Sequence, residues 1–196
     1  MNRKIVFNPF EKHSEITLLI FGLTLTILGS FIGYLMKARF DGIIDMHLVE
    51  NISLIEPFLD NLLNTLSLFV LFFILGKSIN KKTRWVDILS ASIIARIPFY
   101  ILPLFNIGGF LEKITERLLE SIDLENLNSP PAISISDMLT MLLFAGIGIV
   151  CLCWFIALFW NGFRVATNTK GTKNIILFVI MLIVAEVISK FLIAIL

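Results

Sequence analysis

The stretch Met138–Phe163, MLTMLLFAGIGIVCLCWFIALFWNGF, contains no charged residue. A helix needs about 20 mostly apolar residues to cross the hydrocarbon core of a bilayer, and this stretch exceeds that length. Isolated strands would leave backbone groups unpaired in lipid, so only a helix fits it. The stretch predicts a membrane-spanning helix over residues 138–162 and sets the class of the whole chain.

Four further segments are apolar enough to span, at residues 16–36, 61–80, 88–107 and 174–195. Hydrophobic residues make up 57% of the chain and charged residues only 16%, against roughly 25% in soluble globular domains. So few charges cannot cover that much apolar surface in water. The sequence therefore predicts one all-α membrane domain over residues 1–196, an integral membrane bundle of five transmembrane helices.

Lysine and arginine are concentrated in alternate connecting segments. Segments 1–15, 77–87 and 164–173 hold ten of them, against four in segments 37–60 and 112–137. Acidic residues show the reverse, three against eleven. Because cytoplasmic loops carry the excess of basic residues, this pattern predicts a cytoplasmic N-terminus and an external C-terminus. It also supports five spans, since losing one span would scramble the alternation.

Two of the external segments contain more than connecting chain. Leu111, Ile114, Leu118 and Ile122 recur at helical spacing with acidic residues on another face, which predicts a short amphipathic helix over about residues 110–125. We expect this helix to lie on the outer membrane surface or to cap the bundle. The segment 40–59 mixes apolar and acidic residues, and we expect a second, partly helical element along the surface.

Three charged residues fall inside predicted spans: Arg96, Glu186 and Lys190. A charge deep in hydrocarbon costs about 2.5–3.5 kcal/mol or more and usually faces the bundle interior. We therefore expect a candidate intramembrane polar cluster in which Arg96 pairs with Glu186. The pair could be purely structural, or it could line a polar cavity for an ion or solute. Lys190 could neutralise Glu186 one turn away or extend to the interface.

Small residues form one face of the first predicted span. Gly22, Thr26, Gly29 and Gly33 are spaced so that they lie on one side of a helix. Such residues let helix backbones approach closely in lipid. This candidate helix-packing face predicts contact with another helix of the same chain, with a homodimer seam as the alternative. Pro98, just after Arg96, predicts a kink in the third span.

Residues suited to catalysis are sparse. The sequence has no His-Glu-x-x-His zinc motif, no phosphate-binding glycine loop and no pair of intramembrane aspartates. Asp41, Asp45, His47 and Glu50 match no specific metal-ligand spacing, so we expect a solvated loop there. We predict no catalytic, cofactor-binding or metal site, and nothing in the near-zero net charge of +1 suggests nucleic acid.

The stretch Trp154–Lys173, WFIALFWNGFRVATNTKGTK, resembles the end of Yip-domain proteins, a family of small multi-pass membrane proteins. Such proteins end in an aromatic-rich span, a short basic loop and a last apolar span. Here the family-like loop contains Gly162, Arg164, Lys170 and Lys173. Upstream, Gly76-Lys77, Ile88-Leu89 and Ile97-Pro98 resemble the region of the family's second and third spans.

The resemblance implies a five-span helical domain with a cytoplasmic N-terminus. Eukaryotic members act in vesicle traffic and contact prenylated small GTPases, but the chain lacks their Asp-Leu-Tyr-Gly-Pro motif and long N-terminal region. It is more similar to the short bacterial members, which implies a bacterial cytoplasmic (inner) membrane. We expect a non-catalytic protein that organises the lipid bilayer or partner proteins, as a homo-oligomer or with a membrane-protein partner. The alternative is a small-solute or ion transporter or channel using Arg96 and Glu186.

Overall fold

In a computed structural model of the chain, residues 6–120 and 134–195 are described. A short 3-10 turn, η1 (Pro9–Glu11), precedes the first long helix, α2 (Glu15–Leu35). The side chain of Ser14 caps α2 by accepting a hydrogen bond from the backbone N–H of Thr17 at 3.3 Å. The α2 helix is the first of the predicted spans.

A small antiparallel hairpin follows α2 where we expected a partly helical surface element. Strand β1 (Ala38–Arg39) pairs with β2 (His47–Leu48), and residues 40–46 form the tip. The exposed fractions of Phe40 and Ile43 are 0% and 1%, so this hairpin, residues 38–48, reaches into the protein interior. Of the expected partly helical element over residues 40–59, only residues 56–59 are helical, as the start of α3. The hairpin does not lie along the surface, and the physical reason is found in the contacts described below.

The middle of the chain forms α3 (Glu56–Ile79) and then a broken third span. The helix α4 (Trp85–Ala95) ends just before Arg96, and the chain continues as a 3-10 helix, η2 (Ile97–Gly109). Pro98 has no N–H to donate to the carbonyl one turn back, so the α-helix stops there. The interruption is longer than the predicted kink, because the backbone leaves helical geometry again at residues 106–108.

The amphipathic segment forms α5 (Phe110–Glu120), and residues 121–125 of the expected helix lie outside the described part of the chain. Leu111 and Ile114 are buried, and Glu112 forms an ion pair with Lys37 at 2.9 Å. Arg117 forms two hydrogen bonds with Asp137, at 2.7 and 3.1 Å. These contacts show α5 capping one end of the bundle.

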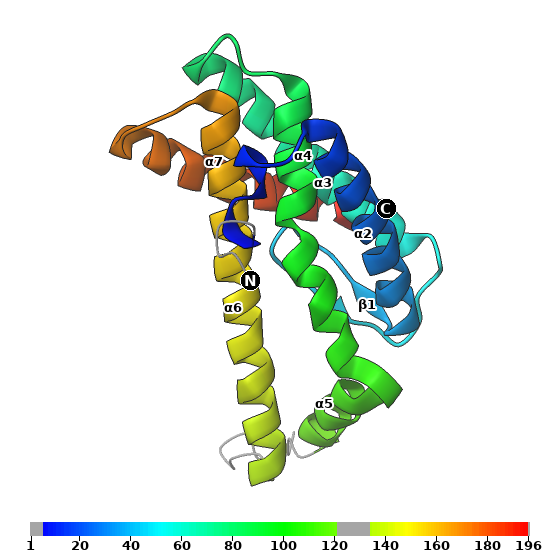
Figure 1. Ribbon diagram of the computed structural model, residues 1–196. Coiled ribbons are helices and arrows are strands. Elements are labelled where there is room, and N and C mark those ends of the chain that lie inside the picture. The colour runs from blue at the N-terminus through cyan, green and yellow to red at the C-terminus, as the bar shows by residue number, and fades with distance from the viewer. Residues whose placement is uncertain (1–5, 121–133, 196) are drawn as a thin grey trace.

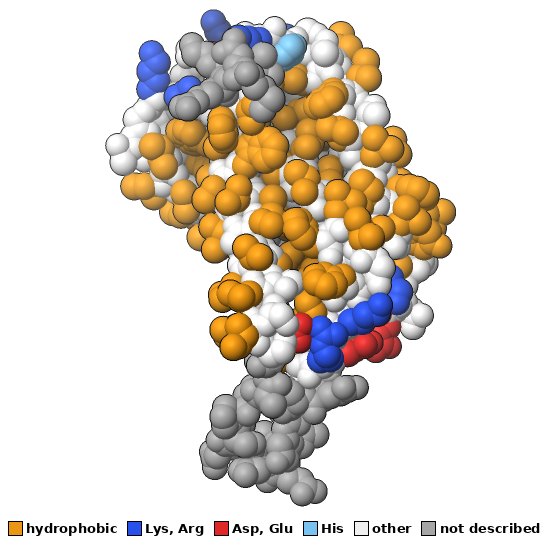
Figure 2. Space-filling model, turned by 60° about the horizontal axis from the view of Figure 1, so that its bottom comes forward, with side chains coloured by type: hydrophobic (Ala, Val, Ile, Leu, Met, Phe, Trp, Pro, Cys, Tyr) orange, Lys and Arg blue, Asp and Glu red, His pale blue; other side chains and the backbone are white. Residues whose placement is uncertain are grey.

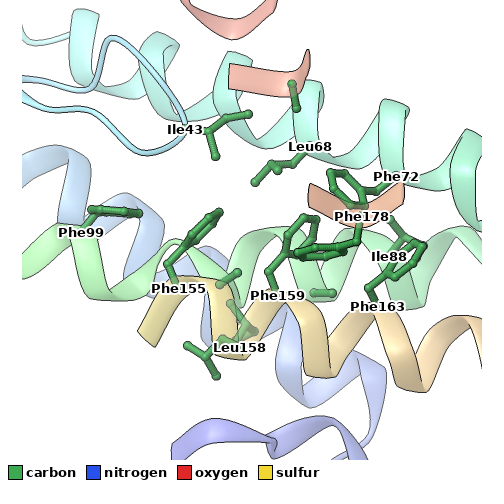
Figure 3. Packing of buried hydrophobic residues seen from close by; sticks show 14 of the residues in the cluster. Ile43, Leu68, Phe72, Ile88, Phe99, Phe155, Leu158, Phe159, Phe163 and Phe178 are labelled. Carbon is green, nitrogen blue, oxygen red and sulfur yellow. The ribbon is translucent and has the colours of Figure 1, made fainter. Parts of the chain in front are cut away.

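The last two helices are α6 (Ile135–Thr167) and α7 (Thr172–Ala194). Figure 1 shows α6 running the length of the molecule, with α4 and η2 beside it and α5 at one end. Phenylalanines from three helices fill the core: Phe72 of α3, Phe159 and Phe163 of α6 and Phe178 of α7 (Figure 3). The ring centroids of Phe72 and Phe159 are 4.5 Å apart and edge to face, a favourable arrangement for aromatic rings.

The outer surface is that of a membrane protein. In Figure 2, hydrophobic side chains cover the visible face between a basic end and an end that carries both acidic and basic side chains. Within the described residues, five helical segments are long and apolar enough to cross a bilayer, the third being Trp85–Leu119. The chain is therefore an all-α, multi-pass membrane protein. The break around Arg96 lies inside this third span, surrounded by protein.

Candidate functional site: the polar cluster around Arg96

Arg96 lies completely buried at the end of α4, with an exposed fraction of 0%. Its Nη1 donates to the backbone carbonyl of Ile43 at 2.7 Å and, at 3.4 Å, to that of Gly42. Its Nη2 donates to Oδ1 of Asn61 at 2.9 Å. The planar guanidinium thus joins α4 to the hairpin tip and to α3.

The polar cluster extends from Asn61 to the first span. The amide nitrogen of Asn61 donates to Oγ of Ser30 at 2.9 Å, and Ser30 is itself completely buried. One turn along α3, the amide nitrogen of Asn64 donates to the carbonyl of Phe40 at 2.7 Å. Because buried backbone carbonyls are costly to leave unpaired, these amides stabilise a hairpin that could not otherwise enter the interior.

An ion pair holds the base of the hairpin. Arg39 donates from Nε to Oδ2 of Asp60 at 2.9 Å and from Nη2 to Oδ1 at 2.7 Å. The backbone N–H of Phe40 donates to the same carboxylate at 3.2 Å. The Asp60 side chain is fully buried, whereas Arg39 is 22% exposed. This two-point geometry is the strong form of a carboxylate–guanidinium contact.

The direct pair between Arg96 and Glu186 that we expected is not formed among the described residues. Glu186 instead accepts a hydrogen bond from the backbone N–H of Ile44 at 3.1 Å. The Nζ atom of Lys190 lies 2.6 Å from Oδ2 of Asp45 and 3.4 Å from Oε1 of Glu186. The hairpin tip therefore lies between the two spans. Arg96 donates hydrogen bonds to its carbonyl groups, and Glu186 accepts one from its backbone N–H.

Of the four polar residues for which we expected a solvated loop, Asp45, His47 and Glu50 are exposed and Asp41 is partly buried. The hydrogen bond from Lys190 lowers the pKa of Asp45 below its usual value. Burial raises the pKa of Asp41, whose carboxylate contacts His47. In the described part of the chain, no group of three or more His, Cys, Asp or Glu side chains is arranged to hold a metal ion.

Several buried polar atoms of Arg96 and α3 have no hydrogen-bond partner among the described residues. They are Nε of Arg96, Oδ1 of Asn64, Oγ1 of Thr65 and Oγ of Ser67. Unpaired buried polar atoms are rare in proteins and mark a strained or hydrated interior. Sequence reasoning named Arg96 and Glu186 but missed Asp60, Asn61 and Asn64. The available signal was the polar residues recurring at helical spacing in the first half of α3.

The small-residue face of α2 packs within the chain. A Cβ at Gly22 would lie 2.5 Å from Ile93, and one at Gly33 would lie 2.9 Å from Phe40. The hydroxyl of Tyr100 donates to Oγ1 of Thr26 at 3.2 Å. This face therefore contacts α4, η2 and the hairpin, so it is not free to form the homodimer seam considered above.

Replacing Gly29 by alanine should lower the free energy of unfolding by about 1–3 kcal/mol, as overpacking does. The new Cβ would lie 2.7 Å from both Cδ atoms of Tyr100, whose ring cannot move without losing its hydrogen bond. Thermal unfolding in detergent measures the effect. Gly148→Ala is the matched control, because a Cβ there meets nothing within 4 Å. Equal melting temperatures for the two variants would contradict this packing.

The residues of the family-like loop lie at the end of the bundle where α3 ends and α7 begins. Gly162 is buried, and a Cβ there would lie 2.6 Å from Cβ of Ala91 and 3.0 Å from the ring of Phe10. Arg164, Lys170 and Lys173 are exposed. The amide nitrogen of Asn80 donates to the carbonyl of Thr167 at 3.0 Å, so the two basic connecting segments meet at this end.

Comparisons of the chain with models of protein families, with curated proteins and with solved structures find no match. Any proposal for its function therefore rests on the structure. The contacts above describe a cluster in which one arginine, one ion pair and the amides of α3 hold a hairpin between the spans. Its chemistry is that of a fixed hydrogen-bonding scaffold.

Proposed function

We propose that the chain is a non-catalytic membrane protein of Yip type that organises partner membrane proteins by lateral helix contact. The single observation that carries this proposal is the use of the interior polar groups. Arg96, Asp60 and Asn61 are engaged with other parts of the same chain. Because these groups are already engaged, we assign function to the surfaces that face the lipid.

One of those surfaces is suited to receive another helix. A hollow of about 260 Å³ lies beside the first half of α6, lined by residues of the hairpin tip, η2 and α6 that include Phe99, Phe144 and Gly148. A Cβ at Gly148, which lines this hollow, would meet nothing within 4 Å. Small residues at an open helix face allow close backbone approach in lipid, where dispersion drives association. We assign this face to the partner.

Cysteine crosslinking in native membranes tests the assignment. After Cys151→Ala and Cys153→Ser, a cysteine at Leu142 beside the hollow should give one discrete crosslinked product with a short bifunctional maleimide. Ile183 on α7 is the matched control, since both side chains are 61% exposed. Gly148→Leu should abolish the product without lowering the melting temperature. Identical patterns from the two cysteine positions would reject the proposed face.

The proposed setting is a bacterial cytoplasmic membrane with the N-terminus inside and the C-terminus outside. The support is the positive-inside pattern together with the grouping of the basic segments at one end. In intact cells, a cysteine at Lys81 should be shielded from an impermeant label and one at Lys113 should react. The opposite labelling pattern would reverse the orientation.

Transport of a small solute or ion is the second candidate. The unpaired polar atoms of Arg96 and α3 favour it, because such groups line hydrated paths in membrane proteins. The backbone contact of Glu186 with the hairpin tip opposes it. If the chain transports, Glu186→Gln should abolish flux in reconstituted vesicles. Equal leak through the wild type and the variant would remove this candidate.

A further inference from the structure

A groove of about 540 Å³ opens on the side of the bundle at its basic end. It lies where α2 begins, α3 ends and α4 begins. Three basic residues, Lys77, Lys82 and Arg84, line it together with Glu15. The remaining wall includes apolar and aromatic side chains, among them Ile16, Phe73 and Trp85. None of these residues belongs to the polar cluster or to the proposed partner face.

The positive charge in the groove is only partly neutralised by the protein. Arg84 forms ion pairs with Asp87, at 2.7 Å, and with Glu15. In the described part of the chain, no carboxylate lies within ion-pair distance of Lys77 or Lys82. The ammonium group of Lys77 donates to the carbonyl of Lys81 at 3.0 Å and lies 5.5 Å from the ring centroid of Phe73. Two lysines are therefore available to an anion.

The start of α4 adds to this positive potential. Arg84 occupies the capping position of α4 without a side-chain cap, and Trp85 and Val86 are its first helical residues. The first N–H groups of a helix have no partner within the helix and carry a partial positive charge. Because Arg84, Trp85 and Val86 line the groove, the first turn of α4 forms part of its wall, where this partial charge adds to that of the lysines.

The apolar wall determines what kind of anion fits. Ile16 and Trp85 are 66% and 57% exposed, so the groove continues onto the surface that contacts lipid chains. Tryptophan side chains such as that of Trp85 are typical of the membrane–water interface. A free phosphate would contact only the basic end of the groove, whereas a phospholipid would also contact its apolar wall. Basic pockets between spanning helices are known to bind anionic headgroups.

We propose that this groove binds one anionic phospholipid of the bordering leaflet. Its phosphate lies against Lys77 and Lys82, and an acyl chain lies along Ile16 and Phe73. The lipid fills the lateral gap between the start of α2 and the end of α3. The site is independent of the partner face on α6, so either proposal can fail without the other.

Tryptophan fluorescence in vesicles tests the site. The chain has three tryptophans, so Trp154→Phe and Trp160→Phe leave Trp85, in the groove, as the only reporter. Brominated phosphatidylglycerol and brominated phosphatidylcholine are compared at equal mole fractions in a phosphatidylcholine bilayer. We expect phosphatidylglycerol to occupy the groove with about thirtyfold selectivity, given two lysines. Lys77→Gln with Lys82→Gln should bring the selectivity close to one.

Lys170→Gln with Lys173→Gln is the matched control, because it removes the same charge at the same end but outside the groove. This control should keep most of the selectivity. Equal quenching by the two lipids in the wild-type groove would overturn the proposal. A loss in the control as large as that in the groove variant would also overturn it, by assigning the preference to the charge of the whole face.

A second measurement avoids the tryptophan substitutions. The lipids that remain bound after purification in mild detergent are quantified for the wild type and for the Lys77→Gln, Lys82→Gln variant. The wild type should retain about one anionic phospholipid per chain, and the variant should retain several-fold less. Equal retention by the two proteins would overturn the proposal.

Discussion

Arg96→Leu is expected to lower the free energy of unfolding by about 3–5 kcal/mol and to release the hairpin tip from the bundle. The substitution leaves the carbonyl of Ile43 and Oδ1 of Asn61 buried without their donor. Each unpaired buried group costs about 1–3 kcal/mol, and removing one member of a buried polar network costs more than replacing the whole network. No other described side chain donates to the carbonyl of Ile43.

Two measurements follow this release separately. Thermal unfolding in detergent reports the stability. A cysteine at Ile43, in a chain with Cys151 and Cys153 replaced, reports the position of the tip through its reaction with a maleimide. Ile43 is 1% exposed, so the cysteine should be inert while Arg96 is present and should react in the Arg96→Leu variant.

Arg96→Lys is the informative control. It keeps the positive charge, but a single ammonium group cannot reproduce the planar fork that contacts α3 and the hairpin together. We expect an intermediate loss of stability. A fully stable Arg96→Leu variant with an inert cysteine would show that the hairpin is held in place without Arg96.

Arg39→Ala is expected to destabilise the protein by about 3–5 kcal/mol, more than Asp60→Ala does. The asymmetry follows from burial. Without Arg39, the carboxylate of Asp60 stays in the interior with no cation, since its side chain is fully buried. Without Asp60, the guanidinium of Arg39 can turn toward the interface, because it is already 22% exposed.

A double-mutant cycle measures this pair. The double variant should be close in stability to Asp60→Ala alone, since removing both partners leaves no isolated buried charge. Lys37→Ala is the matched control from the same loop. The side chains of its ion pair with Glu112 are 45% and 25% exposed, so we expect a loss of no more than about 1 kcal/mol. An Arg39→Ala variant no less stable than this control would refute the role assigned to the ion pair.

The five spans could be predicted from the sequence, because hydropathy and the placement of charges can be read directly from it. Met138–Phe163 is too apolar to be anything other than a span, and it lies within α6. The alternation of basic segments placed Lys81 and Lys170 at one end, where the structure brings their segments together. The amphipathic pattern also located α5, and Pro98 located the break in the third span.

Only part of the candidate site could be predicted from the sequence. Arg96 and Glu186 were identified because charges are rare in apolar segments, which is a local signal. Lys190 was identified as a partner of Glu186, and the two form an ion pair. The contacts of Arg96 and Glu186 with the hairpin were not identified, because they involve backbone groups, which every residue has. The glycine face of α2 predicted close packing, but the identity of its neighbour, Tyr100, depends on how the helices are arranged.

The sequence by itself determined that the chain spans a membrane, how many times it does so and which connecting segments share a side. The first two follow from the transfer free energy of residues taken one after another, and the third follows from the placement of lysine and arginine in the connecting segments. Only the tertiary structure decided that residues 38–48 enter the bundle as a hairpin and separate Arg96 from Glu186. A buried hairpin is stable only if distant side chains, here Asp60, Asn64 and Arg96, satisfy its backbone, and that condition exists only once the helices have packed.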